Sequence, residues 1–298
     1  MAKPKKMFFF PRGKKVIKAE PKSTYHKYNC TNTHLSIFLF FFSSDLKLLH
    51  FVSLFKRQKT NSMGHECIDA SKKCKFSDDV KSGVTEIVLV RHGETTWNAA
   101  GRIQGQMESD LNEIGQKQAV AIADRLGKEE RSVAVYSSDL KRAKDTALMI
   151  AETCFCSEVI EIPDLKERHV GSLQGLYWKE GAEKEPEAYS AFFSSQNHLE
   201  IPGGGESFDQ LCERSMNALE QIAKKHKGER VIVVTHGGVL RAIYLMITKA
   251  SSAGKLLNAS VNVVHYREEK WIIDSWSDVS HLSSVGFLQR GFDGDSKP

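Results

Sequence analysis

Two histidines, each placed between a predicted strand and a glycine, have the clearest potential for chemistry in this chain. His92 follows the predicted strand 86–91, and His236 follows the predicted strand 230–235, and both strands are mostly apolar. Short runs rich in valine and isoleucine predict buried strands. In open α/β sheets, ligands bind at the carboxyl edge of the strands, where the two imidazoles can be brought face to face. A neutral imidazole nitrogen is a good nucleophile near neutral pH.

Arginines and a carboxylate accompany these histidines, and together they suit phosphoryl transfer. Arg91 directly precedes His92, and Arg142 lies in the run SSDLKRA at 137–143. A transferring phosphoryl group carries charge on its oxygens, and the planar guanidinium binds such oxygens bidentately. The alternative interpretation of Arg142 is that it lies on a solvated face of a helix and has no role in the site. A general acid must also protonate the leaving oxygen.

Glu167, within LKERHVG at 165–171, is the best placed carboxylate for that role. Glu161 and Asp164 are its rivals, and a plain loop carboxylate is the alternative interpretation. Arg168 and His169 could serve the pocket or brace the loop, so they stay outside the predicted catalytic set.

Several motifs in a fixed order make the chain resemble the histidine phosphatase superfamily, in its phosphoglycerate mutase-like branch. The resemblance covers roughly residues 85–276. The motif sequences are also similar to those of plant proteins described as phosphoglycerate mutase-like. The matching pieces are RHGET at 91–95, WN at 97–98, GRIQG at 101–105, SSDLKRA at 137–143, LKERHVGSLQGL at 165–176, PGGGES at 202–207 and THGG at 235–238.

The resemblance implies a role for each matching residue. His92 would be the phosphorylated nucleophile, and Glu167 would be the proton donor and then the base for water. Arg91, Arg142 and His236 would bind the phosphoryl group and stabilise its transition state. The residues expected to contact the substrate are Asn98, Gln104, Gly105, Thr95 and Gly237. No metal and no cofactor are expected, since the cationic side chains would do the work of a metal.

Strand and helix patterns alternate along the chain, which predicts a three-layer α/β/α sandwich with a mainly parallel sheet. Strands are predicted at 86–91, 133–136, 158–162 and 230–235, and a hairpin at 261–266 and 270–275. Helices are predicted at 112–126, 139–153, 207–226 and 238–248, with Asn112 and Ser207 as N-caps and Gly127 as a stop. Within the catalytic domain 85–298, an insertion at 172–200 includes a looser helical stretch, 177–197, expected to cover the pocket. The glycines at 203–205 are expected to form a turn ahead of the next helix rather than a phosphate-binding nest.

The first 84 residues have no counterpart in the family, and we expect them to lack a stable fold of their own. Residues 1–62 hold 13 basic and 2 acidic residues, so their net charge is +11 and that of the remainder is −6. Because the part of the chain that holds the catalytic domain is mildly acidic, its charge gives no reason to expect binding to nucleic acid. The apolar run 35–42 is too short to span a membrane. The favoured interpretation is that translation starts at Met63 and that residues 1–62 precede it. The second interpretation is that residues 1–62 are a transit peptide.

The six cysteines lack zinc-finger spacing, so free thiols in a reducing compartment are the default. This favours a cytoplasmic protein, with a plastid or mitochondrion as the alternative if residues 1–62 are a transit peptide. The oligomeric state is open, and a homodimer is one option.

Three functions compete for this pattern. A metal-independent phosphatase acting on a small-molecule phosphomonoester is favoured. A 2,3-bisphosphoglycerate-dependent phosphoglycerate mutase is the alternative, but by resemblance it needs an arginine pair in the insertion to clamp a carboxylate. The only arginine in 170–229 is Arg214, so the clamp looks absent. A non-catalytic phosphoester-binding protein ranks last, because all five expected catalytic residues are present.

Overall fold

The computed structural model of the protein describes residues 83–287. The predictions made for segment 1–84, including the start at Met63, therefore lie outside the described residues except at the last two positions. In the part that is described, no helix has the length and apolar character needed to cross a membrane.

A six-stranded sheet in the order β3-β2-β4-β1-β5-β6 forms the centre of the domain. Its first four strands run parallel, while β5 is antiparallel to β1 and β6 is antiparallel to β5. The strands are β1 (Thr85–Arg91), β2 (Ala134–Ser137), β3 (Val159–Glu161), β4 (Arg230–Thr235), β5 (Val261–Arg267) and β6 (Lys270–Asp278). The α/β fold and the mainly parallel sheet predicted from the sequence are confirmed, and the hairpin lies at one edge of the sheet.

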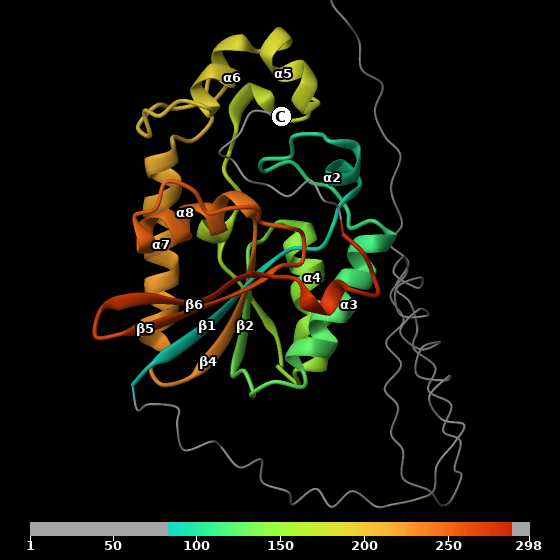
Figure 1. The fold of residues 1–298 in the computed structure, drawn as a ribbon, viewed down its shortest axis with the longest axis vertical. Coiled ribbons are helices and arrows are strands. Elements are labelled where there is room, and N and C mark those ends of the chain that lie inside the picture. The colour runs from blue at the N-terminus through green and yellow to red at the C-terminus, as the bar shows by residue number, and fades with distance from the viewer. Residues whose placement is uncertain (1–82, 288–298) are drawn as a thin grey trace, which may run out of the picture. The chain divides into compact units, whose positions relative to one another are not determined.

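Helices cover both faces of this sheet (Figure 1). The helices are α2 (Thr96–Ala100), α3 (Glu113–Leu126), α4 (Lys141–Thr153), α5 (Trp178–Lys184), α6 (Pro186–Phe192), α7 (Phe208–Lys225) and α8 (Gly237–Thr248). Helices α3 and α4 pack on one face, and α7 and α8 pack on the other. Short 3₁₀ turns lie at Pro163–Leu165, Gly171–Leu173 and Ser280–Leu282.

Strand β1 shows how the sequence builds both layers at once. Alternate side chains of a strand point to opposite faces of a sheet. Ile87 and Leu89 join the core shared with α7 and α8, while Val88 and Val90 join the core shared with α3 and α4. All four are fully buried, which is why this strand reads as an unbroken apolar run.

The predicted helix caps are confirmed. The Asn112 side chain accepts a hydrogen bond from the Gly115 N–H at the start of α3. Ser207 forms a capping box with Gln210 at the start of α7. The chain turns at Gly203 and Gly204, whose φ angles of +86° and +78° lie in the left-handed region that glycine adopts readily. The turn prediction for 203–205 is therefore confirmed.

One predicted helix start was wrong for an identifiable reason, and the helical insertion is now resolved into its elements. The helix predicted from residue 139 begins at Lys141, because Leu140 has an extended backbone and buries its side chain. The helical stretch predicted at 177–197 contains two short helices, α5 and α6. Pro186 starts α6, and the residue before a proline is disfavoured in helical conformation, so α5 ends at Lys184.

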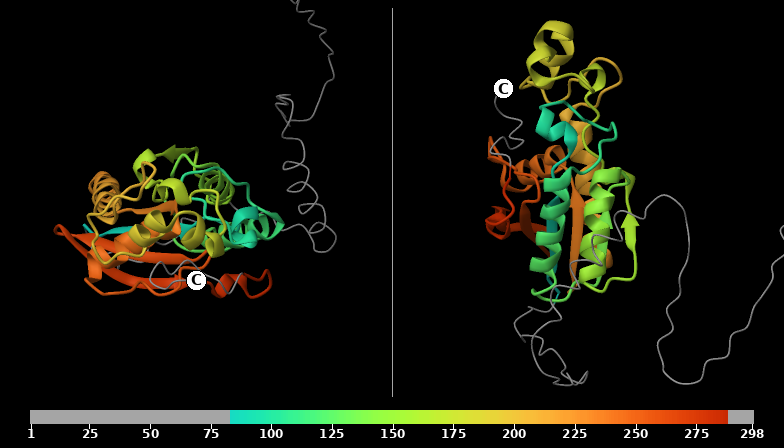
Figure 2. Two further views of the ribbon diagram at one scale, coloured as in Figure 1. Left: turned by 90° about the horizontal axis from the view of Figure 1, so that it is seen from above. Right: turned by 90° about the vertical axis from the view of Figure 1, so that its right-hand side faces the viewer.

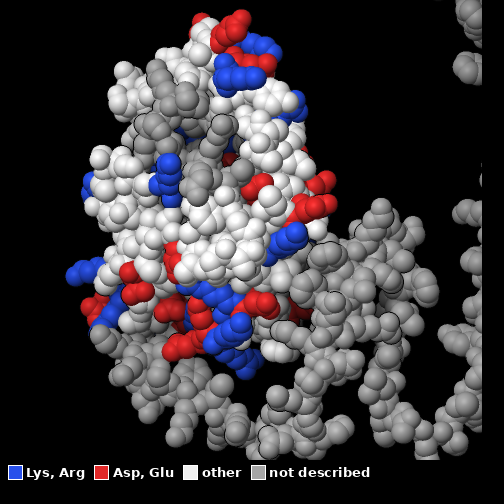
Figure 3. All heavy atoms as spheres, turned by 45° about the vertical axis from the view of Figure 1, so that its right-hand side comes forward, with Lys and Arg blue, Asp and Glu red and all other residues white. Residues whose placement is uncertain are grey.

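The two short helices of the insertion lie beyond the carboxyl ends of the parallel strands (Figures 1 and 2). On the face drawn in Figure 3, acidic and basic side chains are interspersed over the lower part of the described domain. That arrangement differs from the single basic stripe that binds a nucleic acid backbone.

Candidate active site

The two histidines meet at the carboxyl edge of the sheet, as the sequence predicted. Strands β1 and β4 are parallel neighbours with Arg91 opposite Thr235, so the next residue of each strand is a histidine. The ring centroids of His92 and His236 lie 5.1 Å apart, and the ring planes are tilted by 57°. Both side chains are buried.

A backbone carbonyl fixes the orientation of the His92 ring. Nδ1 lies 2.7 Å from the carbonyl oxygen of Gly93, which can only accept, so Nδ1 carries the proton. The lone pair is then on Nε2, the nitrogen on the other side of the ring. Burial lowers the pKa of His92 well below its ordinary 6.5, and the charges of Arg142 and Arg91 lower it further. The imidazole is therefore neutral at physiological pH and able to act as a nucleophile.

His236 is held by a serine that the sequence analysis had not singled out. Its Nε2 lies 2.7 Å from the hydroxyl of Ser138, which follows β2 and is itself buried. Its Nδ1 is buried and has no hydrogen-bond partner among residues 83–287. Burial, followed by the charge of Arg142, lowers the pKa of His236 well below 6.5.

Two buried guanidinium groups add positive charge at the same edge. Arg91 donates from Nη1 to the Leu256 carbonyl. Arg142, from α4, donates to the carbonyls of Met107 (2.9 Å) and Gly105 (2.7 Å). The Nε of each guanidinium is buried without a partner in the described chain. Burial lowers the pKa of each arginine to about 10, so both stay charged at neutral pH. The solvated helix face considered for Arg142 is excluded, because the residue is 1% exposed.

Glu167 lies in the loop after the 3₁₀ turn at Pro163–Leu165, and both its carboxylate oxygens accept backbone hydrogen bonds. Oε1 accepts from its neighbour Arg168 at 2.8 Å, and Oε2 accepts from Gly238 at 3.0 Å. The rival carboxylates lie elsewhere. Glu161 is exposed and pairs with Lys144, and Asp164 is also exposed.

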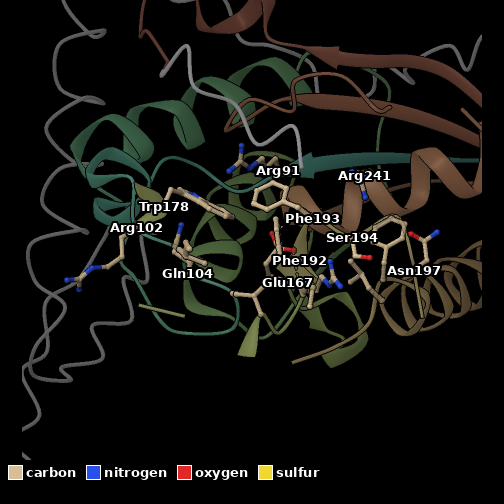
Figure 4. A pocket seen from close by; sticks show the side chains of 18 of the residues that line it. Arg91, Arg102, Gln104, Glu167, Trp178, Phe192, Phe193, Ser194, Asn197 and Arg241 are labelled. Atoms are coloured by element: carbon tan, nitrogen blue, oxygen red, sulfur yellow. Dashed lines mark hydrogen bonds between the residues drawn. The ribbon is translucent and has the colours of Figure 1, made fainter. Parts of the chain in front are cut away.

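A pocket of about 330 Å³ joins these groups, and four of the five predicted catalytic residues line it. His236 is not among the lining residues, but its ring centroid lies 5.1 Å from that of His92, which lines the pocket. Figure 4 shows Glu167 on one side of the pocket and the aromatic side chains of the insertion around it. Those aromatic residues are Trp178, Phe192 and Phe193. The predicted placement of the insertion against the pocket is confirmed.

The predicted substrate-contacting residues divide into two groups. Asn98, Gln104 and Gly105 line the pocket. Thr95 does not, because its side chain caps α2 and lies 3.0 Å from Asn98 Oδ1 and 3.1 Å from Gln104 Oε1. Gly237 does not line it either, and the next residue along α8 takes that place. The Thr95 hydroxyl thus contacts two amide side chains that line the pocket and does not line it itself.

Three further arginines line the pocket: Arg102 and Arg241, which were not predicted as pocket residues, and Arg168, for which the pocket was one of two interpretations. All three come from outside the insertion at 172–200, where an arginine pair was expected for a mutase. Arg214, the only arginine in 170–229, instead pairs with Glu206 and donates to backbone carbonyls that include that of Glu167. One signal could have located Arg241: it is three residues from Gly238 on α8, so both lie on the same helix face.

Comparisons with known proteins identify the family of the chain. Residues 87–279 match the family described as the histidine phosphatase superfamily (branch 1). The chain is 88% identical over 238 residues to an Arabidopsis thaliana protein named metal-independent phosphoserine phosphatase, covering 79% of this chain and all of the relative. It is 52% identical over 221 residues to phosphoglycerate mutase-like protein 4 of Arabidopsis thaliana, covering 74% and 95%.

A solved relative has the same fold. The native structure of a mycobacterial glucosyl-3-phosphoglycerate phosphatase superposes with a TM-score of 0.58 at 30% identity, covering 65% of this chain and 99% of that one. The resemblance seen in the sequence motifs is therefore confirmed over most of the catalytic domain. The chain is an enzyme of the phosphatase type and belongs to the histidine phosphatase superfamily.

Proposed function

We propose that this enzyme hydrolyses phosphoserine or a closely related small phosphomonoester, and that it does so through a phosphohistidine at His92. The observation that carries the substrate is the 88% identity to the relative named metal-independent phosphoserine phosphatase, along that relative's entire length. A more distant relative, 36% identical, is named phosphoserine phosphatase 1 in Hydrogenobacter thermophilus.

In the first step, Nε2 of His92 attacks the phosphorus atom. The new N–P bond forms as the bond from phosphorus to the serine oxygen breaks, and Glu167 gives its proton to that leaving oxygen. Arg91, Arg142 and His236 bind the phosphoryl oxygens and stabilise the charge that they carry in the transition state. The unpartnered Nε atoms of the two arginines and Nδ1 of His236 support this assignment.

In the second step, water attacks the phosphohistidine. Glu167 takes a proton from the water, the N–P bond breaks, and inorganic phosphate leaves with His92 restored. The amides of Asn98 and Gln104 would orient the phosphoryl group, with the backbone of Gly105 beside them. We assign to Thr95 and Gly237 the role of supporting the residues that contact the phosphoryl group. Buried cations supply the positive charge, so we expect turnover to continue without a divalent metal.

The test uses the full chain in the presence of EDTA, with phosphoserine as substrate and free phosphate as the product measured. His92→Ala should reduce kcat by at least about 10⁴-fold, because it removes the covalent step. His198→Ala, on an exposed histidine of the insertion, is the matched control and should keep wild-type activity.

The same samples distinguish the reaction types. Activity that survives in His92→Ala or disappears with EDTA would contradict the mechanism. Formation of 2-phosphoglycerate from 3-phosphoglycerate with a bisphosphate primer, without phosphate release, would instead indicate a mutase.

Location and assembly stay predictions from the sequence. We propose a cytoplasmic enzyme, with a plastid or mitochondrion as the alternative, acting on a small molecule and not on nucleic acid or a membrane. The homodimer also stays a prediction, and sedimentation of the full chain would test it.

A further inference from the structure

Asn258 is a buried asparagine beside the nucleophile, and the phosphoryl-transfer steps do not use it. It lies in the segment 256–260, directly before β5, and the residue is 4% exposed. Its Nδ2 lies 3.2 Å from the His92 carbonyl oxygen and 3.4 Å from the Gly93 carbonyl oxygen. Backbone carbonyl oxygens only accept hydrogen bonds, so the amide is oriented with its NH2 group toward the end of β1.

The segment that carries Asn258 is bonded closely to the end of β1. The Ala259 N–H donates to the His92 carbonyl at 3.2 Å, and the Arg91 N–H donates to the Ser260 carbonyl at 3.1 Å. Ala259 is fully buried and has a φ of +62°, in the left-handed region that residues other than glycine rarely adopt. Residues held in such conformations cluster at functional sites. This turn brings donors from residues 258 and 259 to the same carbonyl oxygen, that of His92.

The NH2 group of Asn258 also reaches Asn98, which lines the pocket. Asn258 Nδ2 lies 3.2 Å from Asn98 Oδ1. The Thr95 N–H donates to the same Oδ1 at 3.1 Å, and the Thr95 hydroxyl lies 3.0 Å from it. A backbone N–H can only donate, so this atom of Asn98 is the amide oxygen. The Nδ2 of Asn98 is therefore the end of the amide that is left to donate to a phosphoryl oxygen.

We infer that Asn258 is a positioning residue for phosphoryl transfer, which holds the Asn98 amide with its NH2 group toward the phosphoryl group. This inference rests on the proposed function, in which Asn98 orients that group. Without Asn258, the Asn98 oxygen loses one of the donors that hold it away from the phosphoryl oxygens. An amide that rotates would then present an acceptor to those oxygens, which can only accept from the enzyme when they are ionised.

Replacing Asn258 should leave the protein folded, because each of its three acceptors has a second donor. The Ala259 N–H still donates to the carbonyl of the nucleophile, and the ring of the nucleophile still donates to the Gly93 carbonyl. The Thr95 N–H still donates to Asn98 Oδ1. The large penalty of a buried acceptor without any donor is therefore avoided.

The test is a double-mutant cycle in the full chain, with kcat/KM for phosphoserine as the readout. Asn258→Ala should lower kcat/KM about tenfold in the wild-type background, because the Asn98 amide is no longer held. In an Asn98→Ala background the same change should lower it less than about twofold, because the group on which Asn258 acts is absent. Asn258→Leu should behave like Asn258→Ala, since leucine fills the space but cannot donate a hydrogen bond.

Asn262 is the matched control, because it is a fully buried asparagine four residues further along the chain. Its Nδ2 donates to the Leu89 carbonyl at 3.2 Å, and its Oδ1 accepts from the Ser277 N–H at 2.7 Å. None of these three residues lines the pocket. Asn262→Ala should therefore lower the thermal midpoint and leave kcat/KM within about twofold of the wild-type value.

Three outcomes would overturn the assignment. Equal losses from Asn258→Ala in the wild-type and Asn98→Ala backgrounds would mean that Asn258 does not act through Asn98. Recovered activity in Asn258→Leu would mean that the residue acts by packing and not by donating a hydrogen bond. Wild-type kinetics in Asn258→Ala would mean that the site does not need it.

Failure of the proposed substrate can be recognised separately. The cycle concerns the phosphoryl group, which every phosphomonoester has, so it can be repeated with p-nitrophenyl phosphate. A wild-type enzyme that hydrolyses this ester but not phosphoserine would contradict the substrate, and the cycle would still test Asn258. If the wild type hydrolysed neither ester, the proposed function would fail. Calorimetric binding of inorganic phosphate to the four proteins of the cycle would then overturn the role of Asn258 if Asn258→Ala lost no affinity.

Discussion

Ser138 controls the second histidine through a single hydrogen bond. Its hydroxyl lies 2.7 Å from Nε2 of His236, and a hydroxyl that donates there leaves the ring proton on Nδ1. Nδ1 is then a donor for a phosphoryl oxygen. We expect Ser138→Ala to lower kcat about tenfold with KM nearly unchanged, since the bond is lost but the pocket wall is kept.

The control for Ser138 is another fully buried serine. Ser215 lies in α7, and its hydroxyl has no partner among the described residues. Steady-state kinetics on phosphoserine should show no loss for Ser215→Ala. Identical kinetics for the two variants would mean that Ser138 does not position His236.

The role of Glu167 depends on the leaving group. A phosphoserine oxygen needs a proton as it leaves, whereas an activated aryl phosphate such as p-nitrophenyl phosphate leaves readily without one. Glu167→Gln should therefore slow phosphoserine hydrolysis at least about 100-fold and slow aryl phosphate hydrolysis much less. Equal losses on both substrates, measured as kcat, would place the proton donor at another residue.

At the scale of elements, the start of α8 must come close to the loop that carries Glu167. A Cβ added to Gly238 would lie 2.2 Å from Oε1 of Glu167, well inside contact distance. The Gly238 N–H also donates to Oε2 of the same carboxylate, so a glycine is needed at this contact. Helix α8 can thus approach the loop that carries Glu167 because residue 238 has no side chain.

Gly238→Ala should displace Glu167 and lower kcat at least about tenfold, while the thermal midpoint changes little. Alanine is a better helix former than glycine, which offsets part of the steric cost. Kinetics and thermal unfolding of the same preparation would check this. A variant with full activity would show that the carboxylate can move without consequence.

For the whole molecule, the buried histidines link catalysis to stability. The pKa of His92 is lowered well below 6.5 in the folded protein, whereas the unfolded chain has the ordinary value of about 6.5. Below that pH the unfolded chain binds a proton that the folded protein does not bind. The free energy of unfolding therefore falls as the pH falls, by up to about 1.4 kcal/mol per pH unit for this residue.

Replacing the histidine should remove its share of that slope. Urea unfolding at pH 7.5, 6.5 and 5.5 should show a weaker pH dependence for His92→Asn than for the wild type. Above pH 6.5 the free energies of unfolding of the wild type and of His92→Asn should depend on pH in the same way, since the His92 ring is then neutral in both the folded and the unfolded protein. Equal slopes between pH 6.5 and 5.5 would mean that His92 is protonated in the folded protein.

The sequence by itself determined the elements and the chemical groups. Short apolar runs located every strand, and helical spacing located the long helices, to within a few residues, because burial imposes those patterns directly. The position of a histidine after each of two strands predicted that the rings could meet at one edge of the sheet, and the pairing of β1 with β4 in the fold brings them together.

Only the tertiary structure decided which other groups reach the pocket. Arg168, Arg241 and Ser138 come from separate loops and helices, and their approach depends on packing between segments far apart in the chain. It also decided that Thr95 and Gly237 stay behind the pocket wall. Local sequence fixes backbone periodicity, whereas side-chain contacts across the fold depend on how whole layers pack, which no short pattern encodes.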